Sequence, residues 1–281
     1  MKMKCWIITK KQIIAAYVIA AAVFVSATVG IGVLATGGRK LPIYGVKTDK
    51  KQVAISFDAA WGADDTDTLI EILGKHKVPA TFFVVGGWVD KYPDEVKKLA
   101  DSGHRVENHS ATHPHMTQLS KEQMLNEIVT CNKKIAAVTG RTPKLFRPPY
   151  GDYDNSVVET VESLGMYAIQ WNCDSLDWQD SATAESIMTR VTQKATNGTI
   201  ILCHNDARYT PAALPSILEK LQGDGYEFVL IEDLIYKDGY TIDNAGIQIK
   251  NPDAESAEKK NKETADAREN DGQKTNAEKT D

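Results

Sequence analysis

The sequence predicts an α/β fold in which amphipathic helices cover a parallel β-sheet. Short β-rich runs alternate with helical stretches over about 200 residues between the two ends of the chain. Seven such strand–helix units follow one another, and chemically reactive side chains stand at the ends of several predicted strands. Seven units indicate a closed or nearly closed (β/α)7 barrel, and a doubly wound open sheet is the alternative.

The elements are placed by hydrophobic periodicity and by start and stop residues. Ser120 with Gln123 is the start signal of the longest helix, and Gly140 and Gly165 each follow a helix as a left-handed stop. The expected strands are 53–58, 80–85, 105–110, 144–149, 167–172, 199–204 and 228–231. The expected helices are 65–76, 93–102, 121–138, 155–164, 184–195 and 213–221.

The N-terminal segment is a candidate membrane span. Residues 13–35 carry no charge over 23 positions, and four lysines lie before them. A bilayer span needs about 20 apolar residues. We therefore expect residues 1–12 in the cytoplasm, a transmembrane signal anchor over 13–35 and a linker over 36–50, with the body of the chain outside the cytoplasm. A cleaved signal, which would leave a secreted protein, is the alternative.

Composition narrows the classes of function. The chain carries a net charge of −5, which argues against a folded nucleic-acid binder with a basic face. Its four cysteines form no C-x-x-C pair, which excludes a Cys-rich zinc module. Residues 251–281 hold 15 charged side chains among 31 and no Ile, Leu, Val, Met or aromatic residue, so we expect a disordered tail. The functional domain is then expected over 51–240.

Polar residues stand at the ends of five predicted strands. They are Asp58, His109, Arg147, Asp174 and His204. In a parallel barrel the carboxyl ends of all strands open onto one face, and that face holds the active site. Within the first strand, side chains alternate, so that Asp58 should face the mouth of the barrel while its bulky neighbours face the helices. The pattern predicts one site built from distant parts of the chain.

Two histidines form the sharpest local signal. His109 and His113 are four residues apart, which places both imidazoles on one face of a helical turn. Such a pair can grip one divalent metal, although a catalytic zinc normally has three protein ligands. The alternative is a polar loop with ordinary surface histidines.

Five motifs in order resemble one family. They are SFDAAWG (56–62), HSATH (109–113), FRPPYG (146–151), DSLDW (174–178) and ILCH (201–204). The set resembles the polysaccharide deacetylases, the NodB-homology domains of carbohydrate esterase family 4, over about residues 50–235. The FD-x-x-WG form of the first motif is similar to the sporulation-type branch. The resemblance implies a distorted (β/α)7 barrel that removes N-acetyl groups from a polysaccharide.

The resemblance also implies roles for proton transfer and metal binding. Asp58 would be the general base, held ionised by Arg147, and His204 the general acid, oriented by Asp177. His109 and His113 would be two metal ligands; zinc is the expected metal, with cobalt, nickel or manganese as alternatives.

Three further residues would contact substrate. The backbone N–H of Tyr150 would face the developing oxyanion, while Trp178 and Leu202 would line the pocket for the sugar ring and the acetyl methyl. Trp61 and Trp171 are expected to pack in the core or at the rim instead.

One position departs from the family. Most members carry two consecutive aspartates, the second a metal ligand, whereas Ala59 follows Asp58 here. A methyl group cannot bind a metal. Asp64, or Asp65 beside it, could substitute as the third ligand; the metal could be held weakly by fewer protein ligands; or the domain could bind glycan without catalysis.

Together these features predict a membrane-anchored, extracytoplasmic hydrolase. The expected substrate is a cell-wall glycan, peptidoglycan or a chitin-like N-acetylglucosamine polymer, and the expected cofactor is a divalent metal. The alternative is a weak or inactive deacetylase-like protein that binds glycan during wall or spore-envelope assembly. No nucleic-acid partner is expected, and nothing in the sequence indicates an oligomeric state.

Overall fold

The computed structural model describes residues 38–252 of the chain. The cytoplasmic segment and membrane span expected over 1–35 lie outside the described residues, as does almost all of the predicted tail. Within residues 38–252, no helix is long and apolar enough to span a bilayer.

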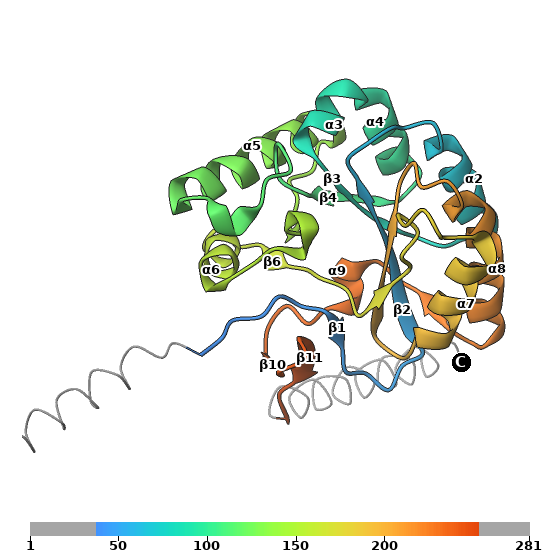
Figure 1. Cartoon of the computed structure of the whole chain (residues 1–281). Helices are drawn as coiled ribbons and strands as arrows, with labels where there is room; N and C mark the ends of the chain where they lie inside the picture. Colours follow the sequence, from blue (N-terminus) through green and yellow to red (C-terminus); the bar gives the residue numbers. More distant parts are fainter. Residues whose placement is uncertain (1–37, 253–281) are drawn as a thin grey trace, which may run out of the picture. The chain divides into compact units, whose positions relative to one another are not determined.

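A curled, largely parallel sheet forms the centre of the described domain (Figure 1). Its main strands are β2 (Gln52–Ala59), β3 (Thr81–Val84), β4 (Arg105–Asn108), β5 (Leu145–Phe146), β6 (Tyr167–Ala168) and β8 (Thr199–His204). They are ordered β8-β2-β3-β4-β5-β6, and each neighbouring pair is parallel. From β2 to β6 the spatial order follows the chain, which is typical of a barrel-type sheet and not of a doubly wound one. The α/β prediction is therefore confirmed.

The short strands at the margins were not predicted from the sequence, except that β9 (Glu227–Phe228) overlaps the expected strand 228–231, whose last residue instead begins the short helix α9 (Ile231–Leu234). Two of them are β7 (Cys173–Asp174), which pairs with β8, and β9, which pairs with the start of β2. The other three are β1 (Gly45–Val46), β10 (Tyr240–Ile242) and β11 (Ile247–Lys250). Strands β10 and β11 form an antiparallel pair, and β11 runs parallel to β1.

The segment from Ile43 to Val46 lies between the two ends of the main sheet. Ile43 forms a parallel bridge with Ile169, just after β6, and Gly45 pairs antiparallel with Thr199 at the start of β8. Part of the expected 36–50 linker is therefore strand. Its backbone N–H and C=O groups are hydrogen-bonded within the protein, whereas those of a solvated linker would be hydrogen-bonded to water.

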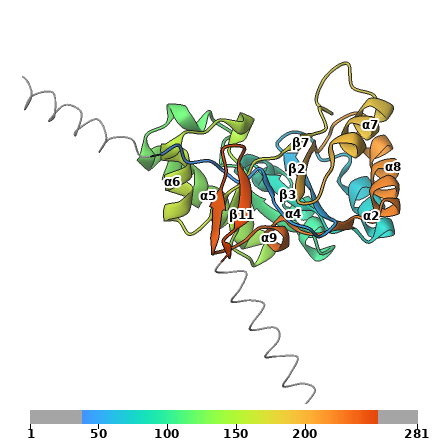
Figure 2. The same cartoon turned by 90° about the horizontal axis from the view of Figure 1, so that it is seen from below.

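Helices lie outside the curled sheet, except for the short α9, whose Ile231 and Leu234 pack in the same cluster as Ala54 on the inner face. They are α2 (Thr66–His76), α3 (Gly86–Lys91), α4 (Pro93–Asp101), α5 (Lys121–Thr139), α6 (Asn155–Ser163), α7 (Ala184–Lys194), α8 (Thr210–Gly223) and α9 (Ile231–Leu234). Helices α2, α8 and α7 lie side by side, and α5 and α6 pack together elsewhere on the domain (Figures 1 and 2). The predicted capping box at Ser120 and left-handed stop at Gly140 are both present in α5.

Strand β2 shows how the packing directs side chains. Val53, Ile55 and Phe57 are buried in the core between sheet and helices, whereas Ala54 belongs to the cluster on the inner face. Asp58 shares the inner side with Ala54, as the period of two requires. Alternation along one strand therefore delivers a carboxylate to the carboxyl end of the sheet.

Candidate active site

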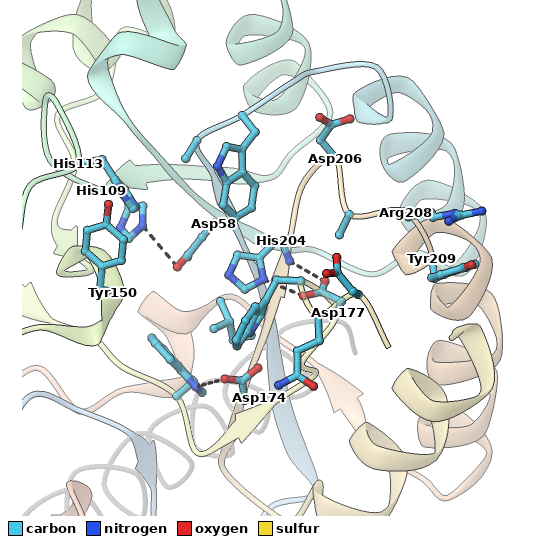
Figure 3. Close-up of a pocket in the computed structure, with 18 residues that line it drawn as sticks. Asp58, His109, His113, Tyr150, Asp174, Asp177, His204, Asp206, Arg208 and Tyr209 are labelled. Carbon is cyan, nitrogen blue, oxygen red and sulfur yellow. Dashed lines mark hydrogen bonds and ion pairs between the residues drawn. The ribbon is translucent and has the colours of Figure 1, made fainter. Parts of the chain in front are cut away.

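A pocket of about 750 Å³ opens at the carboxyl ends of the strands (Figure 3). Asp58 ends the inward face of β2, and His204 stands beside it on β8, where the two residues are direct partners in the parallel register. Both line the pocket, together with His109, His113 and Asp177. The structure thus brings together side chains that are up to about 150 positions apart in sequence.

Asp58 is held by a buried arginine. Arg147 Nη1 donates to Asp58 Oδ1 at 2.6 Å, and the arginine side chain is fully buried. Burial alone would raise the pKa of Asp58, but the charge of Arg147, with His109 and His204 nearby, outweighs it and lowers the pKa below its ordinary 3.8. Asp58 is therefore a carboxylate at neutral pH.

Three other groups fix Arg147 under the pocket. Its Nη2 donates to Ser56 Oγ at 2.9 Å and to the carbonyl of Gln170 at 3.4 Å. The guanidinium also lies 4.0 Å from the ring centroid of Phe83. The roles of Ser56, Gln170 and Phe83 were not predicted from the sequence. For Ser56 the signal was its place two residues before Asp58, on the same face of β2.

The ring of His109 is oriented by the backbone. Its Nδ1 lies 2.7 Å from the carbonyl oxygen of Arg147, and because a carbonyl only accepts, Nδ1 carries the proton. Nε2 is then an unprotonated nitrogen facing the pocket, 3.5 Å from Asp58 Oδ2. Burial lowers the pKa of His109, so the ring stays neutral at pH 7.

His113 and Tyr150 line the pocket beside His109, on the side away from His204 (Figure 3). The rings of His109 and His113 are 4.9 Å apart, and Tyr150 packs edge-on against His113 at 4.5 Å. The expected helical turn does not form, because Ser110 (φ 69°) and His113 (φ 62°) are left-handed. Tyr150 is also left-handed (φ 60°). Such costly conformations in non-glycine residues are often found at functional sites.

His204 and Asp177 form a hydrogen-bonded dyad in which Asp177 is buried and His204 is partly exposed (Figure 3). Asp177 Oδ1 lies 2.7 Å from His204 Nδ1, while Oδ2 accepts from the backbone N–H of His204 and from the hydroxyl of Thr210. Burial lowers the pKa of His204, but the hydrogen bond and negative charge of Asp177, aided by Asp58, outweigh it and raise the pKa above 6.5. The geometry therefore favours the protonated form of His204 beside the ionised Asp58.

The donor set does not fit a three-ligand metal site. Across residues 38–252, no cluster of three or more His, Cys, Asp or Glu side chains could hold a metal ion. His109 and His113 supply two nitrogens, while one oxygen of Asp58 is committed to Arg147. Ala59, at the position of the family's second aspartate, is fully buried in the apolar core.

Asp64 does not complete the set. Its side chain is exposed and does not line the pocket, so the structure does not bring it to the two histidines, and a third ligand at this position stays a prediction. Asp65 is directed elsewhere, because its Oδ2 accepts from the backbone N–H of Asp206 at 2.8 Å. Burial raises the pKa of Asp65 to about 6. The loop after β2 is thus fastened to the loop after β8.

Some of the residues that line the pocket were expected to face substrate, and others were not. Leu202 and Trp178 line the pocket where expected, and the ring of Trp178 is largely exposed. Trp61 and Trp171 line it too, although both were expected to pack in the core or at the rim. The signal for Trp61 was its place three residues after Asp58, followed by Gly62, in a loop at the catalytic end of a barrel strand. The chemical roles assigned to the predicted residues stay predictions.

Comparison with known proteins places this geometry in a family. The polysaccharide deacetylase profile matches residues 45–169. A peptidoglycan-N-acetylglucosamine deacetylase of Bacillus cereus is 34% identical over 195 residues, covering 68% of this chain and 91% of that protein. The peptidoglycan-N-acetylglucosamine deacetylase PgdA of Listeria monocytogenes is 36% identical over 195 residues and covers 69% of this chain. The chain belongs to the polysaccharide deacetylase family.

Solved structures add a contrast within that family. A carbohydrate esterase family 4 pseudoenzyme from Bacillus anthracis is 34% identical, with a TM-score of 0.67 over 70% of this chain and 69% of that chain. A mutant of a pseudoenzyme of this family, described as having restored enzymatic activity, is 35% identical, also with a TM-score of 0.67, and covers 70% of this chain and 71% of that chain. The present chain spans only 41% of the length of the Listeria relative.

Proposed function

We propose that this protein hydrolyses N-acetyl groups on a cell-wall glycan built from N-acetylglucosamine. One observation carries the proposal: Asp58 and His204 are register partners at the ends of adjacent strands. The first has a lowered pKa and the second a raised one. Amide hydrolysis needs such a pair, because one group must accept a proton and another must donate one.

The chain's own residues would divide the work as follows. Asp58 takes a proton from water through Oδ2, the oxygen that Arg147 leaves free. The water oxygen bonds to the carbonyl carbon, and the backbone N–H of Tyr150 is the proposed donor to the developing oxyanion. The C–N bond then breaks, and His204 gives its proton to the leaving amine, yielding acetate and a free amino sugar.

The charges of the pocket favour an uncharged sugar. Asp58 is neutralised by Arg147 and Asp177 by His204. The remaining charged lining consists of three aspartates, Asp174, Asp180 and Asp206, against the single cation Arg208. A lining with excess negative charge repels anionic substituents on a glycan. N-acetylglucosamine therefore suits the pocket better than a sugar bearing a carboxylate.

Acetate release tests the proposal directly. The full chain is incubated with N-acetylglucosamine oligomers and with peptidoglycan, with chelator or with added zinc, cobalt, nickel or manganese. We expect time-dependent acetate from at least one substrate, and none from glucosamine oligomers that lack acetyl groups. No acetate under any metal condition would refute the proposed activity.

Glycan binding without turnover is the second candidate. It is favoured by the lack of a third metal ligand, since Ala59 stands where most of the family has an aspartate. It is also favoured by the likeness to a pseudoenzyme of the family. A bound metal supplies activation of water and carbonyl when it is held at such a site. If the missing ligand limits catalysis, the rate of acetate release should be low while the affinity for glycan is retained.

Replacing Ala59 with aspartate should raise zinc affinity, provided that the new carboxylate turns from the apolar side of β2 toward His109 and His113. Loss of even an outer partner of a metal ligand typically costs 10–100-fold in affinity, so a new direct ligand should contribute more than about tenfold. Calorimetric zinc titration of wild type and Ala59→Asp measures this, with Asp64→Ala as the control that should leave affinity unchanged. Equal zinc affinity of wild type and Ala59→Asp would show that position 59 does not limit the site.

The cellular location is also a proposal. The uncharged stretch over 13–35 and the preceding lysines support export of the domain, with membrane attachment or secretion depending on cleavage. A wall glycan lies outside the cytoplasm, so this location agrees with the proposed substrate. The FD-x-x-WG motif supports a role in sporulation on resemblance alone.

A further inference from the structure

We propose that Trp61 is a specificity-determining residue that contacts the apolar face of the sugar whose amine is released. The inference rests on the proposed function for the identity of that sugar. It assigns a binding role to Trp61, a residue of the first motif that was expected only to pack. Three features of Trp61 support this role: its ring is exposed, its loop is held by hydrogen bonds, and its ring lies close to His204.

Exposed large apolar side chains gather at the pocket. Within residues 38–252, those with high exposure are Trp61 (53%), Tyr150 (62%) and Trp178 (56%), and all three line this one cavity. A large apolar ring left in water costs free energy that burial would recover. Concentration of such rings at one concave site indicates a ligand that covers them.

The loop that carries Trp61 is held on two sides. The carbonyl of Gly62 accepts from the indole nitrogen of Trp88 in α3 at 2.9 Å and from the side-chain amide of Asn205. The N–H of Gly62 donates to Asp206 Oδ2 at 3.2 Å. An added Cβ at position 62 would lie 2.3 Å from that oxygen, so a side chain there would require Asp206 to shift. The ring is therefore exposed on a fixed backbone.

Trp61 stands next to the proton donor. Its ring centroid is 5.6 Å from that of His204, with 38° between the planes. His204 is the group proposed to protonate the leaving nitrogen, which is bonded directly to the sugar ring. A sugar placed for that transfer must lie close to His204 and hence within reach of the indole. The C–H face of a pyranose would then cover the exposed ring.

The chemistry of the Trp61 indole indicates what kind of ligand it would bind. An indole offers a broad apolar surface without charge, so it favours the C–H face of an uncharged hexosamine and adds little for acetate alone. Trp61 should therefore act on binding of the glycan and leave proton transfer nearly unchanged. This separates it from His204, whose loss should act on the chemical step.

The test compares Trp61→Ala and Trp61→Phe with wild type in the full chain. We expect Trp61→Ala to raise the KM for acetate release from an N-acetylglucosamine trimer about three- to tenfold, with kcat within twofold, and Trp61→Phe to recover part of the loss. The Kd of the trimer, measured by calorimetry, should rise by a similar factor. Tyr226→Ala is the matched control, because Tyr226 adjoins β9 at the opposite ends of the strands.

The two proposals can fail separately. If wild type binds the trimer but releases no acetate, the proposed activity fails, and a weaker Kd in Trp61→Ala still supports the sugar contact. If acetate is released but Trp61→Ala and wild type share the same KM and Kd, the Trp61 inference is overturned while the activity stands. A wild type that does not bind the trimer also overturns the inference. Thermal melting of both variants checks that folding is intact.

Discussion

Replacing His204 with alanine is expected to lower the rate of acetate release by about 10²–10⁴-fold, the usual contribution of a positioned general acid. The dyad geometry supports this magnitude, because Asp177 fixes the tautomer and orientation of the imidazole through Nδ1. Nε2 is left as the atom that can deliver a proton into the pocket. Initial rates with an N-acetylglucosamine oligomer measure the effect.

The pH profile separates proton donation from packing. His204 acts when protonated, so acetate release should fall as the pH rises through its pKa, which lies above 6.5. Asp177→Asn removes the main raising influence, so this alkaline limb should move to lower pH. His76→Ala is the matched control, since His76 ends α2 and does not line the pocket. An unchanged rate in His204→Ala would remove His204 from the mechanism.

Replacing Arg147 with methionine is expected to destabilise the domain by about 3–5 kcal/mol, the usual cost of leaving one member of a buried ion pair without its partner. Asp58 is 6% exposed, and the arginine that neutralises it is fully buried. Methionine approximates the length of the side chain but supplies neither charge nor donors. Urea denaturation followed by circular dichroism measures the free energy of unfolding.

Two further variants test the electrostatic origin of that cost. Lys97→Met breaks the exposed pair with Asp101, where both side chains are more than 60% exposed, and should change stability by less than about 1 kcal/mol. Asp58→Asn combined with Arg147→Met removes both charges and should recover part of the loss. If the double variant were as unstable as the sum of the singles, packing rather than charge would explain the effect.

Much of the parallel sheet could be predicted because its signals are local. The alternation Val53, Ile55, Phe57 against Ala54 and Asp58 reflects one strand with two different faces, and the structure has it so. The marginal strands β1 and β10 could not be predicted, since two or three residues carry no periodicity. Their pairing is decided by distant partners.

The candidate site likewise contains residues whose place could be predicted from the sequence and residues whose place could not. Strand ends predicted which reactive side chains would meet, because parallel strands share a carboxyl edge. The place of Asp64 depends on how its loop folds, and the hydrogen bond from Asp206 to Asp65 fastens that loop to the loop after β8. Likewise, the exposure of Trp61 follows from contacts of Gly62 with Trp88 and Asn205, which sequence spacing does not show.

The segment from Ile43 to Val46 has a practical consequence for truncated forms of the protein. A fragment starting at residue 51, as the sequence alone would suggest, would strip Ile169 and Thr199 of their neighbours and leave two bare strand edges facing each other. Unpaired edges of this kind invite self-association. Trimming for expression or crystallisation should therefore stop short of Lys40, whose backbone N–H also donates to Asn155 at the start of α6.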